Sequence, residues 1–415
     1  MSHKIVKSYN YIQKNIVKTP LDFNYRLSNL YNTNVFYKRE DLQITRSFKL
    51  RGNLNKISKI IAKVKDHYNK GFVCASAGNH AQGFAYICSK FNLDGTIYVP
   101  KTTPLQKINR IKYYGGNNTN IQLFGNNFDE CLNKAVEVSK KTNKYFIHPY
   151  DDYDIINGQG TIALEIAQVL KPDFIICPIG GGGLISGISK YTKTINPDCK
   201  IIGVEPKNAE SMTMALQNNH PTKLENIDIF VDGASVPLVG KKTFELCREI
   251  GIDKIYSVPN NKICFEMVNC YQDDGIILEP AGALSLSIFD KLGQDYCLQG
   301  KNVVSILSGG NNDITRYGEI TQLSLEYMGL IHYFVIEFSQ TTGQLKYFIN
   351  NILDDDTDII RFEYIKKTNK YYGKVLLGVQ LSNKQMIDSL MANLVSNKVN
   401  FKKIEYNDLY YDILV

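Results

Sequence analysis

Hydrophobic and polar positions follow two periods from the N-terminus to about Tyr327. Short runs rich in β-branched residues recur between longer stretches in which apolar residues return every three or four positions. The short runs predict strands at Val35 to Tyr37, Gly71 to Ala75, Thr96 to Val99, Ile121 to Leu123, Phe174 to Cys177, Lys200 to Val204 and Asn302 to Leu307. The longer stretches predict helices, among them Leu54 to Lys65, Ala81 to Phe91, Phe128 to Lys141 and Gly160 to Leu170. This alternation indicates an α/β fold with parallel sheets covered by helices on both faces.

One polar segment divides this pattern. Residues around Asn143 to Asn157 include the turn-forming run His-Pro-Tyr-Asp-Asp, which indicates a crossing between two lobes rather than a helix or a strand. We therefore expect a first domain of residues 1–325, in which a small lobe of about residues 55–150 is inserted in a larger one, with a cleft between the two lobes.

The pattern changes in the last quarter of the chain, residues 326–415. A helix at Glu319 to Met328 leads to it. The predicted elements are a strand at Tyr333 to Phe338, a helix from Gly343 to Leu353, strands near Ile359 to Tyr364 and Lys374 to Leu381, a helix at Lys384 to Val395 with Ser382 as its N-cap, and a strand at Phe401 to Ile404. The order β-α-β-β-α-β is that of a ferredoxin-like α+β domain. This region carries no nucleophile, metal cluster or phosphate loop, so it favours ligand sensing or assembly.

Composition and charge narrow the class of protein. Among 415 residues, 48 are basic and 41 acidic, and the net charge of +7 is spread without a block of like charges. This favours a solvated surface and argues against a nucleic-acid partner. No stretch approaches the ~18 apolar residues of a membrane span, and the start lacks a signal-peptide core, so we expect a cytoplasmic protein without membrane contact. Nine scattered cysteines without a Cys-x-x-Cys pair predict a reducing compartment and reduced, mostly buried thiols.

Four short runs together point to one cofactor. They are Ser47 to Gly52 (Ser-Phe-Lys-Leu-Arg-Gly), Ser76 to His80 (Ser-Ala-Gly-Asn-His), Gly180 to Gly183 and Ser308 to Asn311 (Ser-Gly-Gly-Asn). Lys49 offers an amine that forms an imine, the glycines offer a phosphate cradle, and Ser308 offers a partner for a ring nitrogen. Pyridoxal 5'-phosphate needs all three.

Each run also has a plainer reading. Lys49 alone is as well explained by a surface lysine at a helix start, and only the accompanying runs favour the imine. The glycine run follows an apolar strand and precedes a plausible helix start, so its N–H groups and the helix dipole suit a phosphate, whereas the alternative is a flexible turn. It fits neither the P-loop nor the dinucleotide motif. Ser308 either faces the ring nitrogen or caps a helix.

The run from Ser76 to His80 follows a strand at a helix start, where free amides suit a substrate carboxylate. Asn79 can donate a hydrogen bond to the cofactor's phenolic oxygen. A lone histidine such as His80 more often packs or caps than catalyses. Glu279, in Glu-Pro-Ala-Gly-Ala, either faces the cleft or caps the helix that follows.

These runs, in this order, resemble those of the threonine dehydratases (threonine deaminases), fold-type II pyridoxal-phosphate enzymes built like tryptophan synthase β. The resemblance covers nearly the whole chain, and residues 326–415 resemble a single ACT-like regulatory domain. It implies dehydration and deamination of L-threonine to 2-oxobutanoate and ammonia, with L-serine giving pyruvate as a side activity. It also implies the first step of isoleucine biosynthesis, with isoleucine or valine as allosteric ligand, and a homo-oligomer, dimer or tetramer.

The resemblance implies a role for each matching residue. Lys49 holds the cofactor and removes the Cα proton, Phe48 packs against the ring, and Asn79 binds the phenolic oxygen. Ser308 meets the ring nitrogen, and a hydroxyl there suits elimination better than transamination. The phosphate is bound by Gly180, Gly181, Gly182 and Gly183. The substrate is bound by Ser76, Ala77, Gly78, Asn79 and His80.

Two departures from related serine racemases sharpen the prediction. Those racemases carry a serine acid/base where this chain has Ala77, so racemisation lacks its second proton donor here. Their metal motif begins like Glu205-Pro206, but Ser211 stands in place of the last acid, and we predict no metal.

Two other functions remain open from the sequence. One keeps the cofactor but performs β-replacement, as cysteine and threonine synthases do. The other is an amino-acid sensor with a degenerate catalytic lobe, against which the intact Lys49, tetraglycine and Ser308 argue. Phe338 to Leu345 and Phe362 to Tyr364 are the segments expected to bind a feedback ligand.

Overall fold

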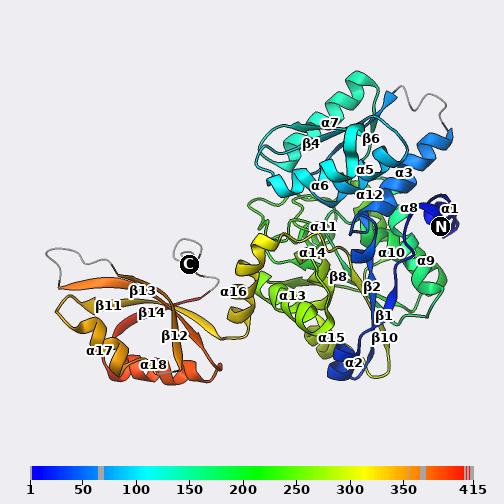
Figure 1. The fold of residues 1–415 in the computed structure, drawn as a ribbon. Coiled ribbons are helices and arrows are strands. Elements are labelled where there is room, and N and C mark those ends of the chain that lie inside the picture. The colour runs from blue at the N-terminus through cyan, green and yellow to red at the C-terminus, as the bar shows by residue number, and fades with distance from the viewer. Residues whose placement is uncertain are drawn as a thin grey trace. The chain divides into compact units, whose positions relative to one another are not determined.

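The computed structural model describes residues 2–63, 70–354, 356–364, 371–405, 408 and 411, and predictions for other residues, such as the last two of the helix Leu54 to Lys65, lie outside it. It divides into two compact units, Met1–Arg316 and Tyr317–Val415, each described here by itself (Figure 1). None of the described helices is long and apolar enough to cross a membrane.

The first unit contains two sheets. The larger has the strand order β1-β2-β10-β7-β8-β9, in which β1 is antiparallel to β2 and all other neighbours are parallel. Its strands are β1 (Leu21–Phe23), β2 (Asn34–Arg39), β7 (Phe174–Pro178), β8 (Lys200–Pro206), β9 (Lys254–Val258) and β10 (Asn302–Leu307). The smaller is parallel throughout, in the order β5-β4-β3-β6, with β3 (Phe72–Ala75), β4 (Gly95–Val99), β5 (Thr119–Leu123) and β6 (Tyr145–Phe146). The predicted α/β class is thus confirmed.

Helices surround both sheets (Figure 1). Those of the first unit are α1 (His3–Ile12), α2 (Tyr25–Tyr31), α3 (Lys49–Lys63), α5 (Asn79–Lys90), α6 (Leu105–Gly115), α7 (Phe128–Thr142), α8 (Tyr153–Gln159), α9 (Thr161–Ala167), α10 (Gly183–Ile195), α11 (Ser211–Asn218), α12 (Lys241–Ile250), α13 (Asn260–Asp274), α14 (Pro280–Ala283) and α15 (Phe289–Asp295).

Strand β3 shows why helices cover both faces of the smaller sheet. All four of its residues are buried, and successive side chains point to opposite faces. Phe72 and Cys74 pack in a core with apolar residues of α3, α5 and α6, whereas Val73 and Ala75 pack against α7. A strand that is apolar on both faces is stable only between two helical layers.

The crossing segment corrects two expectations. It contains strand β6 and helix α8, although we expected neither. β6 has only two residues, too few for a period to show, and α8 begins because the Asp152 side chain accepts hydrogen bonds from the N–H groups of Asp154 (2.7 Å) and Ile155 (3.3 Å). The helix expected over Gly160 to Leu170 is also shorter, since α9 ends at Ala167.

Helix α3 begins earlier than predicted, at Lys49 rather than Leu54, and a buried charge network fixes this start. Arg51 is fully buried, and its guanidinium donates to Glu40 and Glu165 at 2.8 Å each. Lys38 donates to Glu165 at 2.6 Å. Burial alone would raise the pKa of Glu40, but Arg51 holds it below its ordinary value. The arginine of the first run therefore anchors the helix and does not line the site.

The second unit has the predicted ferredoxin-like order. Its antiparallel sheet runs β12-β13-β11-β14, and α17 and α18 lie on one side of it (Figure 1). Phe348 of α17 and Leu390 and Leu394 of α18 pack there against the sheet. Its elements are α16 (Tyr317–Tyr327), β11 (Ile331–Ser339), α17 (Gln344–Asn351), β12 (Thr357–Tyr364), β13 (Tyr372–Leu381), α18 (Met386–Ser396) and β14 (Asn400–Ile404).

One predicted cap in this unit is wrong. Ser382 does not cap α18, which begins at Met386 after a turn, and its hydroxyl meets the Met386 sulfur at 3.1 Å. The Asn383 side chain instead accepts a hydrogen bond from the Gln385 N–H at 3.1 Å, and this Asx turn delays the helix.

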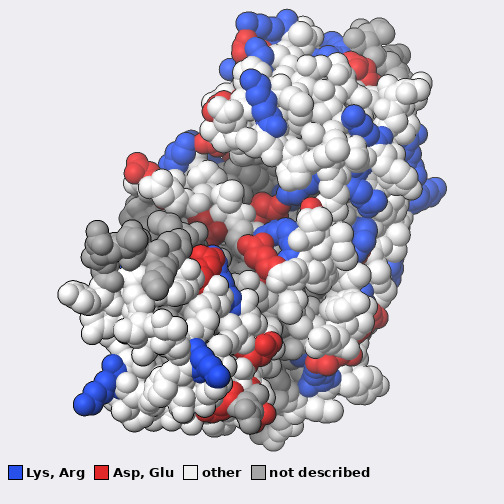
Figure 2. Space-filling view, turned by 60° about the vertical axis from the view of Figure 1, so that its left-hand side comes forward, with Lys and Arg blue, Asp and Glu red and all other residues white. Residues whose placement is uncertain are grey.

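The face of the molecule drawn in Figure 2 agrees with the expected charge distribution. On this face, Lys and Arg side chains are interspersed with neutral and acidic ones. Eight cysteines are buried and Cys297 is exposed. Both observations fit what the sequence predicts.

Candidate active site

The first and fourth runs lie against each other, although about 260 residues separate them. Ser47 forms a β-bridge with Gly309, the Phe48 N–H donates to the Ser308 carbonyl at 3.1 Å, and the Gly310 N–H donates to the Arg46 carbonyl at 3.0 Å. Helix α3 starts directly after this pairing. Lys49, its first residue, is therefore held beside the end of strand β10, where Ser308 stands.

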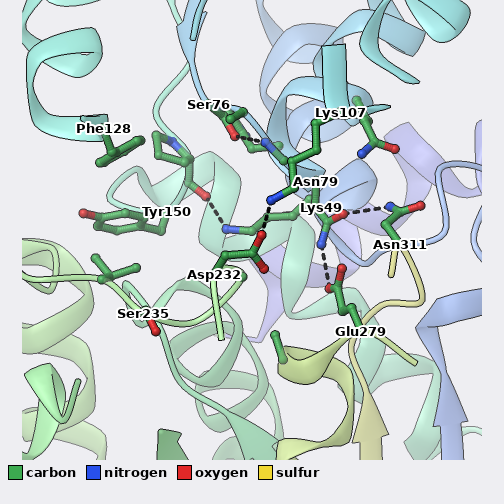
Figure 3. Close-up of a pocket in the computed structure, with 18 of the residues that line it drawn as sticks. Lys49, Ser76, Asn79, Lys107, Phe128, Tyr150, Asp232, Ser235, Glu279 and Asn311 are labelled. Carbon is green, nitrogen blue, oxygen red and sulfur yellow. Dashed lines mark hydrogen bonds and ion pairs between the residues drawn. The ribbon is translucent and has the colours of Figure 1, made fainter. Parts of the chain in front are cut away.

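The amine of Lys49 lies at the centre of the site (Figure 3). Its Nζ donates to the Pro149 carbonyl at 3.1 Å and lies 5.3 Å from the centroid of the Phe48 ring. Burial lowers its pKa to about 8, and the nearby Glu279 carboxylate acts in the opposite direction. An amine in this state is partly neutral near neutral pH, as a nucleophile or a base must be.

The glycine run walls a small cavity of about 40 Å³ that Lys49 and Ser308 also line. Gly182 has φ +87°, which favours glycine, and α10 begins at the next residue. A Cβ on Gly181 would stand 2.3 Å from the Tyr150 ring, and one on Gly180 would stand 3.0 Å from Ala234. The loop is therefore a tight cradle at a helix N-terminus, where N–H groups can receive an anion.

A larger cavity of about 240 Å³ adjoins the cradle and shares Phe48, Lys49 and Ser308 with it. The second run lines it at the start of α5. A Cβ on Gly78 would meet no atom within 4 Å, so the cavity is open there. Because Asn79 is the first residue of α5, first-turn N–H groups lack partners within the helix and can bind a carboxylate.

Asn79 joins a chain of polar groups (Figure 3). Its Nδ2 donates to Glu279 Oε1 at 2.7 Å, and its Oδ1 accepts from Asn311 Nδ2 at 2.7 Å. The amide nitrogen carries two hydrogens, so one remains for a ligand. Asn311 also donates to the Thr45 carbonyl at 2.9 Å, which fixes the amide orientation.

His80 takes a structural position. Its side chain is buried and its Nε2 lies 3.0 Å from the Ile147 carbonyl. Burial, together with the nearby Lys49 ammonium, lowers its pKa to about 3. The ring is therefore neutral and engaged with backbone, which favours packing over acid/base work.

Glu279 faces the cavity, and its backbone precedes α14. Burial raises the pKa of its carboxyl to about 7, and the Asp232 charge adds to this, whereas the hydrogen bond from Asn79 opposes it. Asp232 itself forms an ion pair with Lys107 of α6. Figure 3 shows this pair joining the two sides of the pocket.

Several lining residues were missed from the sequence. Tyr150 stands beside the glycine cradle, within the segment predicted as a crossing between two lobes. Its hydroxyl donates to the Leu238 carbonyl at 3.1 Å. Asn311 belongs to the fourth run, and this membership is the signal that could have identified it. Lys107 and Asp232 carry no motif, and only the fold brings them together.

The cavity fits pyridoxal phosphate on its own geometry. The cradle has no room for side chains at Gly181, the partly neutral amine of Lys49 stands beside it, and the buried Ser308 hydroxyl lies across the same space. These residues would hold the phosphate, the aldehyde carbon and the ring nitrogen respectively.

Glu205, the first residue of the altered metal motif, has a different partner. Its carboxylate accepts hydrogen bonds from the N–H groups of Met212 (2.7 Å) and Thr213 (3.0 Å) at the start of α11. It therefore caps that helix.

The chain is similar to known proteins over both units. Residues 12–309 match the family of pyridoxal-phosphate dependent enzymes, and residues 323–414 match the C-terminal regulatory domain of threonine dehydratase. The biosynthetic L-threonine dehydratase of Halalkalibacterium halodurans is 44% identical over 402 residues, covering 96% of this chain and 95% of the relative. That of Bacillus subtilis is 41% identical over 412 residues, covering 98% and 96%.

Solved structures resemble most of the chain. The processed form of threonine deaminase isoform 2 from Solanum lycopersicum matches with a TM-score of 0.72 and 38% identity, covering 78% of this chain and 94% of that chain. Serine racemase from Dictyostelium discoideum matches with a TM-score of 0.69 and 31% identity, covering 76% and 99%.

Proposed function

The chain belongs to the pyridoxal-phosphate-dependent threonine dehydratases, and on this premise we propose that it deaminates L-threonine to 2-oxobutanoate and ammonia. L-Serine is the slower substrate and gives pyruvate. The reaction is the first step of isoleucine biosynthesis, and it takes place in the cytoplasm. The observation that carries the proposal is the meeting of Lys49, the glycine cradle and Ser308 around one small cavity.

Each part of the site has its own role in the proposed reaction. Bound in the cavity, the cofactor supplies an aldehyde carbon and an electron-withdrawing ring that together acidify Cα of an amino acid. Lys49, with its lowered pKa, accepts the Cα proton at Nζ. The first-turn N–H groups of α5 hold the substrate carboxylate. The Ser308 hydroxyl is uncharged, so it does not keep a proton on the ring nitrogen as a carboxylate would. This favours loss of hydroxide from Cβ over transamination.

The experiment compares the wild type with Lys49→Ala and Lys49→Arg. We expect 2-oxobutanoate from L-threonine and a visible cofactor absorption band only with the wild type, because arginine keeps the charge but stays protonated. Formation of 2-oxobutanoate is followed with L-threonine and then with L-serine. A variant that keeps the wild-type rate would contradict the role of Lys49.

Racemisation is the second candidate, since serine racemases are among the structural neighbours. Ala77 lines the pocket where those enzymes need an acid/base on the other side of Cα, and a methyl group carries no transferable proton. We therefore expect no D-serine from L-serine in the same assay. Its appearance at a rate near that of pyruvate would favour racemisation.

We also propose that the second unit binds isoleucine, or valine less tightly, as a feedback inhibitor. Phe338 packs near Phe362 and Tyr364, with ring centroids 6.3 and 6.2 Å apart, so the two candidate segments meet in one unit. Leu345, at the end of the first segment, is 41% exposed and offers an apolar contact. The edge strands β12 and β14 suit pairing between copies, and we propose a homo-oligomer.

The variant Leu345→Ser tests the isoleucine site. We expect the concentration of isoleucine that halves the rate to rise about fivefold or more, because a lost buried apolar contact costs ~1 to 2 kcal/mol. Val395→Ser, which changes an exposed aliphatic residue of α18, is the control and should leave inhibition unchanged. Both variants should keep the uninhibited rate. Equal inhibition of both would place the ligand elsewhere.

A further inference from the structure

A second cavity of the first unit lies among lysine side chains. Its volume is about 510 Å³, compared with about 240 Å³ for the substrate side of the active site. Helices α1, α3, α8 and α10 line it. Its lysines and its one acid are Lys4, Lys7, Lys59, Lys63, Lys190 and Asp154.

Among the described residues that line this cavity, lysines outnumber acids. Asp154 is paired with Lys59 at 2.8 Å and with Lys56 at 3.5 Å. Among the residues that the structure describes, Lys4, Lys7, Lys63 and Lys190 form no ion pair with a carboxylate. Lys4, Lys7 and Lys63 are exposed to solvent, and a concave surface with an excess of positive charge concentrates anions.

The positive charge of Lys190 is unfavourable because its side chain is buried. Its side chain is only 7% exposed, and its Nζ donates to the neutral Asn157 Oδ1 at 2.9 Å. Burial lowers the pKa of Lys190, the Lys4 and Lys59 ammonium groups lower it further, and Glu249 opposes them. A buried ammonium group without a carboxylate partner in the described chain is unfavourable, and a bound anion would offset that cost.

Three of the helices around this cavity also contribute to the active site. α3 begins at Lys49, and α10 begins at Gly183 of the glycine cradle. α8 follows the segment of Pro149 and Tyr150 that contacts the Lys49 amine and the cradle. A ligand among the lysines would therefore brace the elements that hold the cofactor.

We propose that this cavity binds a small anion with two or more phosphate charges, separately from the cofactor. Ammonium groups bind phosphate as point charges, and four of them face one space without acidic partners in the described chain. The proposal goes beyond the deaminase reaction and does not depend on it. Inorganic pyrophosphate is the simplest probe of this chemistry.

The test is calorimetric titration of the cofactor-loaded enzyme with pyrophosphate at constant ionic strength. We expect one saturable site per chain, with the visible cofactor absorption unchanged. Lys4→Gln/Lys7→Gln should weaken binding about tenfold or more. Lys112→Gln/Lys140→Gln removes the same charge from exposed positions of α6 and α7 and should bind as the wild type does.

A second measurement uses Lys190→Met. Without pyrophosphate this variant should melt at a higher temperature than the wild type, because the unpaired buried charge is gone. Pyrophosphate should raise the melting temperature of the wild type and leave that of the variant unchanged. Absence of saturable binding, equal weakening in both double variants, or a less stable Lys190→Met protein would each overturn the proposal.

Discussion

At the scale of single residues, Glu279 shows how position sets acidity. Its carboxyl is enclosed by the cavity wall, accepts a hydrogen bond from Asn79 and lies near Asp232, and burial gives it a pKa of about 7 instead of 4.5. A group whose pKa rises on folding stabilises the fold fully below its unfolded pKa and loses that contribution as pH rises through the folded value. The folded protein should therefore become less stable between pH 4.5 and 7.

Glu279→Gln should remove this dependence. The difference in unfolding free energy between variant and wild type should grow by about 3 kcal/mol across the window, since 2.5 pKa units at 1.36 kcal/mol each separate the two values. Chemical denaturation of cofactor-free protein from pH 4.5 to 7 measures it. Lys49, whose pKa is lowered to about 8, and Glu205, whose pKa is raised, are common to both proteins. Parallel curves would mean that folding leaves the Glu279 pKa unchanged.

Sequence reasoning predicted candidate site residues only within short runs. Lys49, Gly181 and Ser308 sit in short patterns that can be matched to a chemistry, and the structure gathers them around one cavity. Tyr150 and the Lys107–Asp232 pair have no local signature, because their place depends on contacts between distant segments. Arg51 belongs to a run but is a buried ion-pair partner, so membership in a motif alone did not separate anchoring from binding.

At the scale of elements, the turn between β7 and α10 joins the strand end to the helix start through Ile179 and three glycines. Gly181→Ala should lower the affinity for pyridoxal phosphate at least about tenfold, because its Cβ would overlap the Tyr150 ring at 2.3 Å. Absorption titration of cofactor-free protein measures the affinity. Gly78→Ala is the control, since its Cβ meets no protein atom, and it should retain cofactor binding. Equal affinities for both variants would contradict a tight cradle.

Seven strands of the first unit were predicted from short runs, and β3 and β7 among them are buried on both faces. β1, β6 and β9 were not predicted, nor was helix α8. β6 is too short for periodicity, and α8 is polar at its start, so both looked like turn. Ser382 does not cap the helix because the side chain of the next residue, Asn383, forms an Asx turn that delays the helix start.

At the scale of the whole molecule, the two units have separate cores. A chain that ends at Arg316 should fold and deaminate threonine without any response to isoleucine, since the solved neighbours correspond to a comparable share of the chain. A chain that ends at Lys301 lacks β10 and Ser308 and should neither fold nor bind the cofactor. Activity and visible absorption of both proteins test this. An active shorter chain, or inhibition of the longer one by isoleucine, would contradict it.

The change of pattern near Gly318 predicts a second unit, but it does not predict the strand order. β10 lies between β2 and β7, which precede it by more than 100 residues in sequence. Periodicity describes only local burial, and adjacency between such distant strands leaves no trace in it.

The central place of β10 also governs the order of events during synthesis. A ribosome that has released β2 and β7 has exposed two strand edges whose common neighbour is still to be translated. Until residue 307 emerges, these edges lack their native neighbour and are free to pair with each other or with other chains, which makes the growing polypeptide prone to aggregation. The cofactor can bind only after β10 has formed, because Lys49 is translated early and Ser308 late, and both residues line the site.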